Sequence, residues 1–132
     1  MPSFHDSASS PAPPEEVWKL LYDPSRFPDW WAGIGTVDVQ NDRQYTMYPD
    51  GDPDLPMAQV LDTRHDQQRV TVSCLVSDLR FEWRLQPDGE GTLIAVDVAI
   101  PDAESHRLDT QREIISASMR RLAELAAEPL DA

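Results

Sequence analysis

The residue types that most often do chemistry in proteins are scattered in this sequence. His5, His65 and His106 are far apart and fall in three different predicted elements, so no spacing brings two of them to one metal ion. Cys74 alternates with valines in a predicted strand and has no base near it that would activate its thiol. We expect the histidines at the surface and Cys74 as a small buried apolar residue, and the sequence identifies no catalytic residue.

Asp50, Asp52 and Asp54 alternate in a proline-rich segment and superficially match a calcium-binding loop. That loop pattern needs a bidentate acidic ligand further on and a helix on each side, whereas here a strand is predicted from Met57. We therefore expect a solvated loop over residues 49–56, no metal site and no cofactor.

The amino-acid composition limits the kinds of molecule that the protein can bind. The 132 residues contain 11 Lys and Arg against 24 Asp and Glu, giving a net charge of −13, which repels nucleic acid and anionic lipid surfaces. A single cysteine allows no intramolecular disulfide, and no leader or long apolar run is present. These features predict one domain over residues 1–132, without membrane insertion, in the cytoplasm.

Two short helices are predicted near the N-terminus, after a first strand over residues 3–9. Pro14 suits the start of a helix, and Glu15 and Glu16 place negative charge at its positive end, so a helix is expected over residues 14–22. Asp23 followed by Pro24 predicts a second cap and a second short helix that ends near Trp31.

Six further strands are predicted from alternation and turn residues. Residues 79–86 show the cleanest period of two, and the turn at residues 87–91 pairs them with residues 92–100 as a hairpin. The other predicted strands cover residues 36–40, 43–48, 57–63 and 69–76.

One long helix is expected to close the chain. Asp102 can cap it and Pro129 stops it after Ala127, which gives about 25 residues or roughly 38 Å. Its apolar stripe includes Ile115 and Met119, with Gln111 and Ser118 on or beside the same face. We place Arg107 on the side that faces solvent.

These elements resemble those of the SRPBCC or START-like superfamily, in its polyketide cyclase/dehydrase-like branch. The resemblance covers the whole chain and rests on the segment APPEEVWKLLYDPSRFPDWWAGI, on Gly91-Thr92 opening a late strand, and on residues 118–126. It implies an α+β helix-grip fold: a curved seven-stranded antiparallel sheet, with two short helices after strand 1, wrapped around the C-terminal helix. It also implies a cavity between sheet and helix that holds an apolar small molecule.

Alternation places several side chains toward that cavity. Similar proteins have an apolar first strand in the phase that ends at Ser10, but here that phase contains Asp6, which could point inward as a general base or ligand anchor, or lie in solvent at a frayed edge. Ordinary core packing is the competing interpretation for the other candidates. The candidate ligand-binding residues are Asp6, Trp30, Trp31, Tyr45, Met47, Phe81, Trp83 and Ser118.

The function that this pattern favours is non-catalytic binding of a small hydrophobic or aromatic metabolite, lipid-like or polyketide-like, because the polar candidates are few and include no acid–base pair. One alternative is a polyketide cyclase/aromatase or dehydratase, with Asp6 or Tyr45 transferring a proton. Another is a regulatory or chaperone-associated domain that works through its surface. Exposed Phe27, Trp30 or Trp31 could also form a homodimer.

Overall fold

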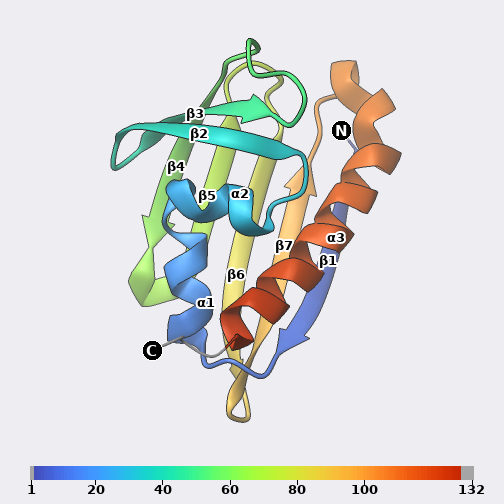
Figure 1. Ribbon diagram of the computed structural model, residues 1–132. Helices are drawn as coiled ribbons and strands as arrows, with labels where there is room; N and C mark the ends of the chain where they lie inside the picture. Colours follow the sequence, from blue (N-terminus) through green and yellow to red (C-terminus); the bar gives the residue numbers. More distant parts are fainter. Residues whose placement is uncertain (1, 129–132) are drawn as a thin grey trace.

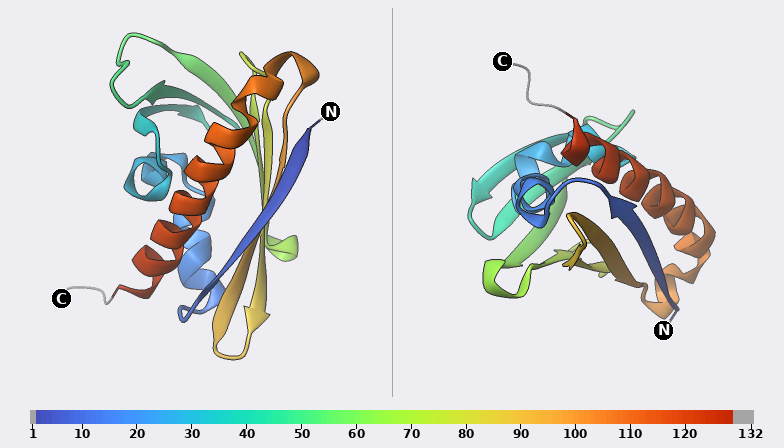
Figure 2. Two further views of the ribbon diagram at one scale, coloured as in Figure 1. Left: turned by 90° about the vertical axis from the view of Figure 1, so that its right-hand side faces the viewer. Right: turned by 90° about the horizontal axis from the view of Figure 1, so that it is seen from below.

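Seven antiparallel strands form one curved sheet, and α1, α2 and α3 lie on its concave side (Figures 1 and 2). The structure is a computed structural model that describes residues 2–128. The strands are β1 (Ser3–Ser10), β2 (Ile34–Asn41), β3 (Gln44–Pro49), β4 (Met57–Arg64), β5 (Arg69–Cys74), β6 (Arg80–Asp88) and β7 (Gly91–Ala99). The helices are α1 (Pro14–Leu21), α2 (Phe27–Trp30) and α3 (Leu108–Ala127), with 3-10 helices η1 (Pro24–Arg26), η2 (His65–Gln67) and η3 (Asp102–Arg107).

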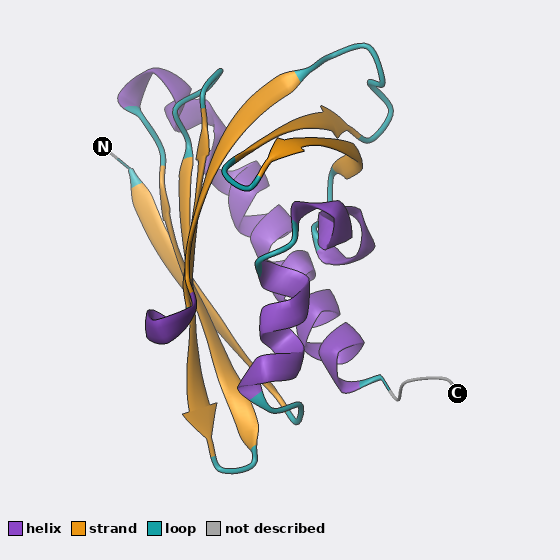
Figure 3. Cartoon of the chain, turned by 90° about the vertical axis from the view of Figure 1, so that its left-hand side faces the viewer, coloured by secondary structure: helices purple, strands orange, loops and turns teal. Residues whose placement is uncertain are grey.

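The strand order is β1-β7-β6-β5-β4-β3-β2, so β1 joins the sheet beside the last strand and β2 lies at the opposite edge. Figure 3 shows β2 and β3 curling over the helices at one end of the sheet, while α3 runs along its concave face. This is the helix-grip arrangement, and the predicted α+β fold, with its seven strands and two short helices after strand 1, is confirmed.

The N-terminal helices form for the reasons that the sequence indicated. Pro14 occupies the first turn of α1, where a missing backbone N–H removes no intrahelical hydrogen bond. Asp23 caps η1, because its Oδ1 accepts the N–H of Ser25 at 3.1 Å. The chain then bends into α2, which ends before Trp31.

The β6–β7 hairpin shows how alternation decides which side chains reach the concave face. Phe81, Trp83 and Leu85 are buried, whereas the intervening residues are exposed or half-buried. Their partners on β7 are buried too, since Phe81 pairs with Val98 and Trp83 with Val96. Burial on one face of the sheet therefore sets the register.

Several predicted boundaries differ by one or two residues, and two of the differences have a clear physical reason. The fifth strand ends at Cys74 and not at residue 76, because a turn follows in which Asp78 has a φ of 59° and donates its N–H to the oxygen of Cys74. Leu75 and Val76 are 56% and 63% exposed as a result.

The last helix is shorter than expected. Residues 102–107 form η3, and only the 20 residues of α3 are α-helical. Asp102 is the first residue of η3 and not its cap, a position that Pro101 holds. No residue of η3 is buried, so no packing favours the α-helical form there, whereas the buried stripe of α3 does.

Hydrogen bonds join the end of β1 to α3, and the segment after β1 to β7. Ser10 Oγ donates to the oxygen of Ala123 on α3 at 2.8 Å, and Thr92 Oγ1 donates to the oxygen of Ala12 at 2.8 Å. Gly91 is required at this crossing, because a Cβ there would lie 2.3 Å from the oxygen of Ser10. The sheet and α3 are thus fixed together at this end.

Aromatic side chains fill the centre of the core. Trp30 contacts Trp83 and Trp31 at ring-centroid distances of 5.2 and 5.4 Å, and Phe27 contacts Tyr45 at 5.6 Å. Phe27, Trp30 and Trp31 are 0%, 2% and 6% exposed, so these residues do not present the exposed aromatic surface through which a homodimer could have formed.

Other features agree with expectation. The histidine side chains are at least 55% exposed and Cys74 is buried. Residues 50–56 form an exposed loop. Among residues 2–128, no helix is both long enough and apolar enough to cross a bilayer.

Candidate ligand-binding pocket

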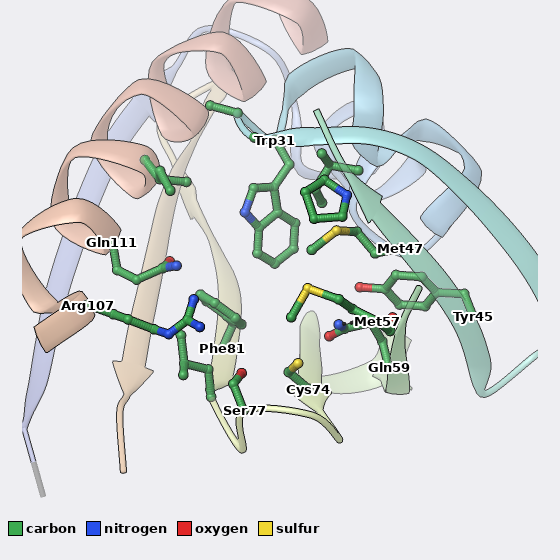
Figure 4. A pocket seen from close by; sticks show the side chains of 16 residues that line it. Trp31, Tyr45, Met47, Met57, Gln59, Cys74, Ser77, Phe81, Arg107 and Gln111 are labelled. Atoms are coloured by element: carbon green, nitrogen blue, oxygen red, sulfur yellow. Dashed lines mark hydrogen bonds between the residues drawn. The ribbon is translucent and has the colours of Figure 1, made fainter. Parts of the chain in front are cut away.

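A partly open cavity of about 180 Å³ lies between the end of the sheet where β3, β4 and β5 meet and the start of α3 (Figure 4). Most of its wall is apolar, and a few polar groups are spaced around it. The lining residues are Trp31, Ala32, Gly33, Ile34, Tyr45, Met47, Pro49, Met57, Gln59, Cys74, Ser77, Leu79, Phe81, Arg107, Gln111 and Ile114.

Strand register assembles the sheet side of the cavity. Tyr45 on β3 is paired with Gln59 on β4, and Gln59 is paired with Cys74 on β5, so three side chains form one row across the strands. Met47 and Met57 form the next row. Flexible methionines beside a rigid aromatic ring give a wall that can adapt to the shape of a guest.

The opposite wall comes from the segment after α2. Trp31 follows the last residue of α2 in an extended conformation, and Gly33 then turns the chain into β2 with a φ of 88° that favours glycine. The Trp31 ring meets that of Phe81 edge-on at a centroid distance of 5.0 Å. These rings separate the cavity from the packed core around Trp83.

Arg107 and Gln111 supply polar groups from the helix side. They are four residues apart, so they lie one helical turn from each other on the same face. Arg107 Nε donates to Glu104 Oε2 at 2.6 Å, and the arginine side chain is 42% exposed. Our placement of Arg107 on the solvent side was therefore incomplete, because the residue also lines the cavity. Gln111 is on the face expected for it.

Gln111 has a polar atom without a partner. Its Oε1 is buried and accepts no hydrogen bond among the residues that the structure describes. A buried acceptor in this state costs roughly 1–3 kcal/mol of stability. Gln111 also lines the cavity, so the rest of its amide is one of the few polar groups beside a bound molecule.

Tyr45 brings a phenol to the same space. Its ring is 2% exposed, and Figure 4 shows the hydroxyl directed into the cavity. Burial raises the pKa of Tyr45 well above its usual value, with a smaller contribution from Cys74. The phenol therefore stays protonated at neutral pH and can donate a hydrogen bond.

Four of the eight predicted site residues line the cavity: Trp31, Tyr45, Met47 and Phe81. The other four lie outside its lining. Trp30 and Trp83 belong to the packed core, where Trp30 Nε1 donates to the oxygen of Leu20 at 2.9 Å. Trp83 Nε1 is buried without a partner among the described residues, so its N–H does not reach the cavity as a polar handle.

Ser118 is fully buried, and its hydroxyl is used within the protein. Ser118 Oγ donates to the oxygen of Ile114 at 2.6 Å and accepts the N–H of Ala32 at 2.9 Å. The residue therefore ties α3 to the segment after α2. It positions the lining residues Ala32 and Ile114 without lining the cavity itself.

Asp6 lies on the concave side of β1, in phase with buried Ser10, and is half-buried. Its Oδ1 accepts the N–H of Ser7 at 2.8 Å. Of the two orientations considered for Asp6, the structure has the one toward the concave side of the sheet. The residue nevertheless lies outside the lining of this cavity. Its role as a ligand anchor stays a prediction.

Sequence reasoning missed several lining residues. Gln59 lies on the same face of β4 as Met57 and buried Leu61. A polar residue on an otherwise apolar face could therefore have identified it as a lining residue. For Arg107 the signal was its spacing of four from Gln111. Leu79 begins the alternating run of residues 79–86 in the phase of Phe81, so alternation was its signal, whereas Ser77 belongs to a turn, where no periodicity applies.

Metal chemistry has no evident site in the described part of the chain. Among residues 2–128 no three His, Cys, Asp or Glu side chains gather where they could hold one ion. What the cavity offers is an apolar wall, a phenol, two amides and a guanidinium, a set suited to binding an organic molecule.

Comparisons with known proteins agree with this geometry. A family model described as "Polyketide cyclase / dehydrase and lipid transport" matches residues 1–127. No curated protein gives a significant sequence match.

Solved structures share the fold at low identity. The protein XoxI from Bacillus cereus is 16% identical, with a TM-score of 0.80 and 97% of each chain covered. The di-domain ARO/CYC BexL from the BE-7585A biosynthetic pathway is 14% identical with a TM-score of 0.78, covering 98% of this chain and 48% of that one. Ara h 8.0201 is 14% identical with a TM-score of 0.67, over 95% of this chain and 97% of that one.

Proposed function

Because this chain belongs to the polyketide cyclase/dehydrase and lipid transport family of SRPBCC proteins, we propose that it binds a small, mainly apolar ligand in the cavity between the sheet and α3. The observation that carries the proposal is the cavity itself, whose apolar wall is interrupted by a few polar groups. In this proposal residues 1–132 act as one ligand-binding domain. The contacts are Trp31, Tyr45, Met47 and Phe81, together with groups from η3 and α3.

Cavity volume restricts the size of the ligand. An apolar cavity of about 150 Å³ in another protein accommodates benzene, so the 180 Å³ here suits one aromatic ring with a short substituent. A lipid or a full polyketide would have to project through the mouth or widen the cavity. A one-ring metabolite is therefore the best-fitting class.

Burial of such a ligand gives limited affinity. Removing about 200 Å² of apolar ligand surface from water contributes about 5 kcal/mol before ordering costs are subtracted. That alone corresponds to binding weaker than about 0.1 mM. A physiological ligand therefore needs polar contacts as well, for which Tyr45, Gln59, Arg107 and Gln111 are available.

We also propose a compartment, from the cysteine content of the chain. Cys74 is buried as a free thiol, and the sequence has no second cysteine with which to form an intramolecular disulfide. This composition suits a reducing environment, so we place the protein in the cytoplasm.

Native mass spectrometry of the gently purified protein tests the proposal. We expect a co-purifying compound, or an added neutral probe such as cinnamamide, to appear as a one-to-one complex. Absence of any complex, both in the protein as purified and with cinnamamide supplied at about 10 mM, far above that limit, would contradict the proposal.

A cyclase or dehydratase acting in the same cavity is the second candidate. Tyr45 favours it, because a buried phenol that stays neutral and faces the cavity can donate a hydrogen bond to negative charge developing on a substrate oxygen. Incubating the protein with its co-purifying compound separates the two functions. Turnover that Tyr45→Phe abolishes, with binding retained, would indicate the enzyme, whereas an unchanged compound supports a binding protein.

A further inference from the structure

We infer that the ligand carries a carboxylate, which Arg107 and Gln111 bind at the α3 side of the cavity. The inference rests on the proposed function and names the ligand class for that site: an aromatic acid of about one ring. It depends on the position of these two side chains, on the charge of the lining and on the unpaired amide.

Arg107 and Gln111 act from one direction. Arg107 ends η3 and Gln111 lies in the first turn of α3, four residues later. Figure 4 shows both side chains reaching from the helix into the cavity, with the Arg107 guanidinium lying toward Phe81 and Ser77. A guest stacked against Phe81 would therefore have its polar end within reach of both groups.

The charge of the lining contrasts with that of the whole chain. Acidic residues outnumber basic ones by 24 to 11 in the sequence, yet Arg107 alone is charged among the described residues that line the cavity. Random placement on such an acidic chain would favour a carboxylate there. An arginine without an acidic lining residue beside it favours an anionic guest.

Glu104 leaves most of the guanidinium available. The Glu104 carboxylate accepts from Arg107 Nε at 2.6 Å, and His106 Nε2 lies 3.7 Å from the same carboxylate oxygen. A guanidinium has five N–H donors, so the Nη edge can still bind a second carboxylate with two parallel hydrogen bonds. Glu104 thus orients Arg107 without using up its donors.

The unpaired amide of Gln111 fits the same guest. Its Oε1 is buried without a partner among the described residues, whereas no such orphan is found at Nε2. Nε2 is therefore the end of the amide that is not enclosed, and it carries two N–H donors. It can donate to a ligand carboxylate beside the Arg107 guanidinium, since both side chains line the cavity.

Two probes of nearly equal shape test this directly. Cinnamate and cinnamamide share one ring and a short chain but differ in charge. Isothermal titration should show that the wild-type protein binds cinnamate about tenfold more tightly, the effect of a charge-assisted hydrogen-bonded pair on a partly exposed arginine.

Variants identify the residues responsible. Arg107→Met should lower the affinity for cinnamate about tenfold and leave that for cinnamamide within twofold. Gln111→Leu should also lower the affinity for cinnamate, because it removes the amide that donates to the ligand carboxylate while leaving Arg107 in place. Arg120→Met is the matched control, because Arg120 is exposed on α3 and its removal changes the net charge by the same amount.

Equal affinity of the wild-type protein for both probes would overturn the carboxylate inference while leaving the proposed function in place. Equal losses in Arg107→Met and Arg120→Met would also overturn it, since bulk charge would then explain the preference. If neither probe binds, both the inference and the proposed function fail.

Discussion

Filling the cavity should stabilise the protein and abolish binding together. Cys74 is 5% exposed and its side chain faces the cavity. Replacing it with leucine adds about 60 Å³ of side chain, and cavity volume costs about 24 cal/mol per Å³ when it is left empty. The Cys74→Leu variant should therefore gain about 1 kcal/mol in free energy of unfolding, since the open mouth makes the full product an upper bound.

Urea unfolding and titration with cinnamamide measure the two effects. We expect a higher urea midpoint with an unchanged slope, and affinity for cinnamamide lowered at least tenfold. Val72→Leu is the control, because Val72 lies two residues earlier on the same buried face of β5, is 1% exposed and does not line the cavity. It adds about half the volume, yet should destabilise the protein by about 1 kcal/mol through overpacking.

Destabilisation of the protein by Cys74→Leu, as by Val72→Leu, would refute this prediction, since the space beside Cys74 would then be packed. Unchanged binding of cinnamamide in a stabilised Cys74→Leu variant would place the ligand elsewhere.

Three further perturbations test separate parts of the account. Ser118→Ala should lower the free energy of unfolding by about 1–2 kcal/mol, because the Ala32 N–H loses the oxygen that it contacts at 2.9 Å; unchanged urea unfolding would contradict this. Trp30→Phe should cost about 1 kcal/mol more than Trp83→Phe in the same assay, because only Trp30 Nε1 has a hydrogen-bond acceptor among the described residues; equal costs would show that this bond contributes little. Burial raises the pKa of Tyr45, so above about pH 10 the unfolded chain loses a phenol proton that the folded protein keeps, and stability falls with rising pH by up to about 1.4 kcal/mol per unit. Tyr45→Phe lacks this contribution, so its stability should decline less between pH 9 and pH 11, and parallel declines would contradict the burial of the phenol.

Much of the fold was predictable because local patterns and burial agree. The alternation of Phe81, Trp83 and Leu85 identified β6 and its buried face. Pro14 and Asp23 marked two helix starts from backbone chemistry alone. Such signals depend on neighbouring residues, so a single sequence contains them.

The cavity was less predictable because it depends on distances between elements. Phase showed that Tyr45 and Trp83 both face the helices, but only the curvature of the sheet leaves space beside Tyr45 and packs Trp30 against Trp83. Ser118 likewise has a hydroxyl that could contact a ligand. In the structure that hydroxyl is hydrogen-bonded to the backbone of Ala32 and Ile114. Alternation predicts the face of the sheet toward which a side chain points, but not whether it contacts other side chains or a cavity there.

Methyl NMR of methionines is the most direct test that the space between the sheet and α3 receives a guest. Met47 and Met57 line the cavity, whereas Met119 is buried in the core outside it. Titration with cinnamate should shift the methyl signals of Met47 and Met57 in a saturable way and leave that of Met119 nearly unchanged. Shifts confined to other methyl groups, or none at saturating cinnamate, would contradict the account.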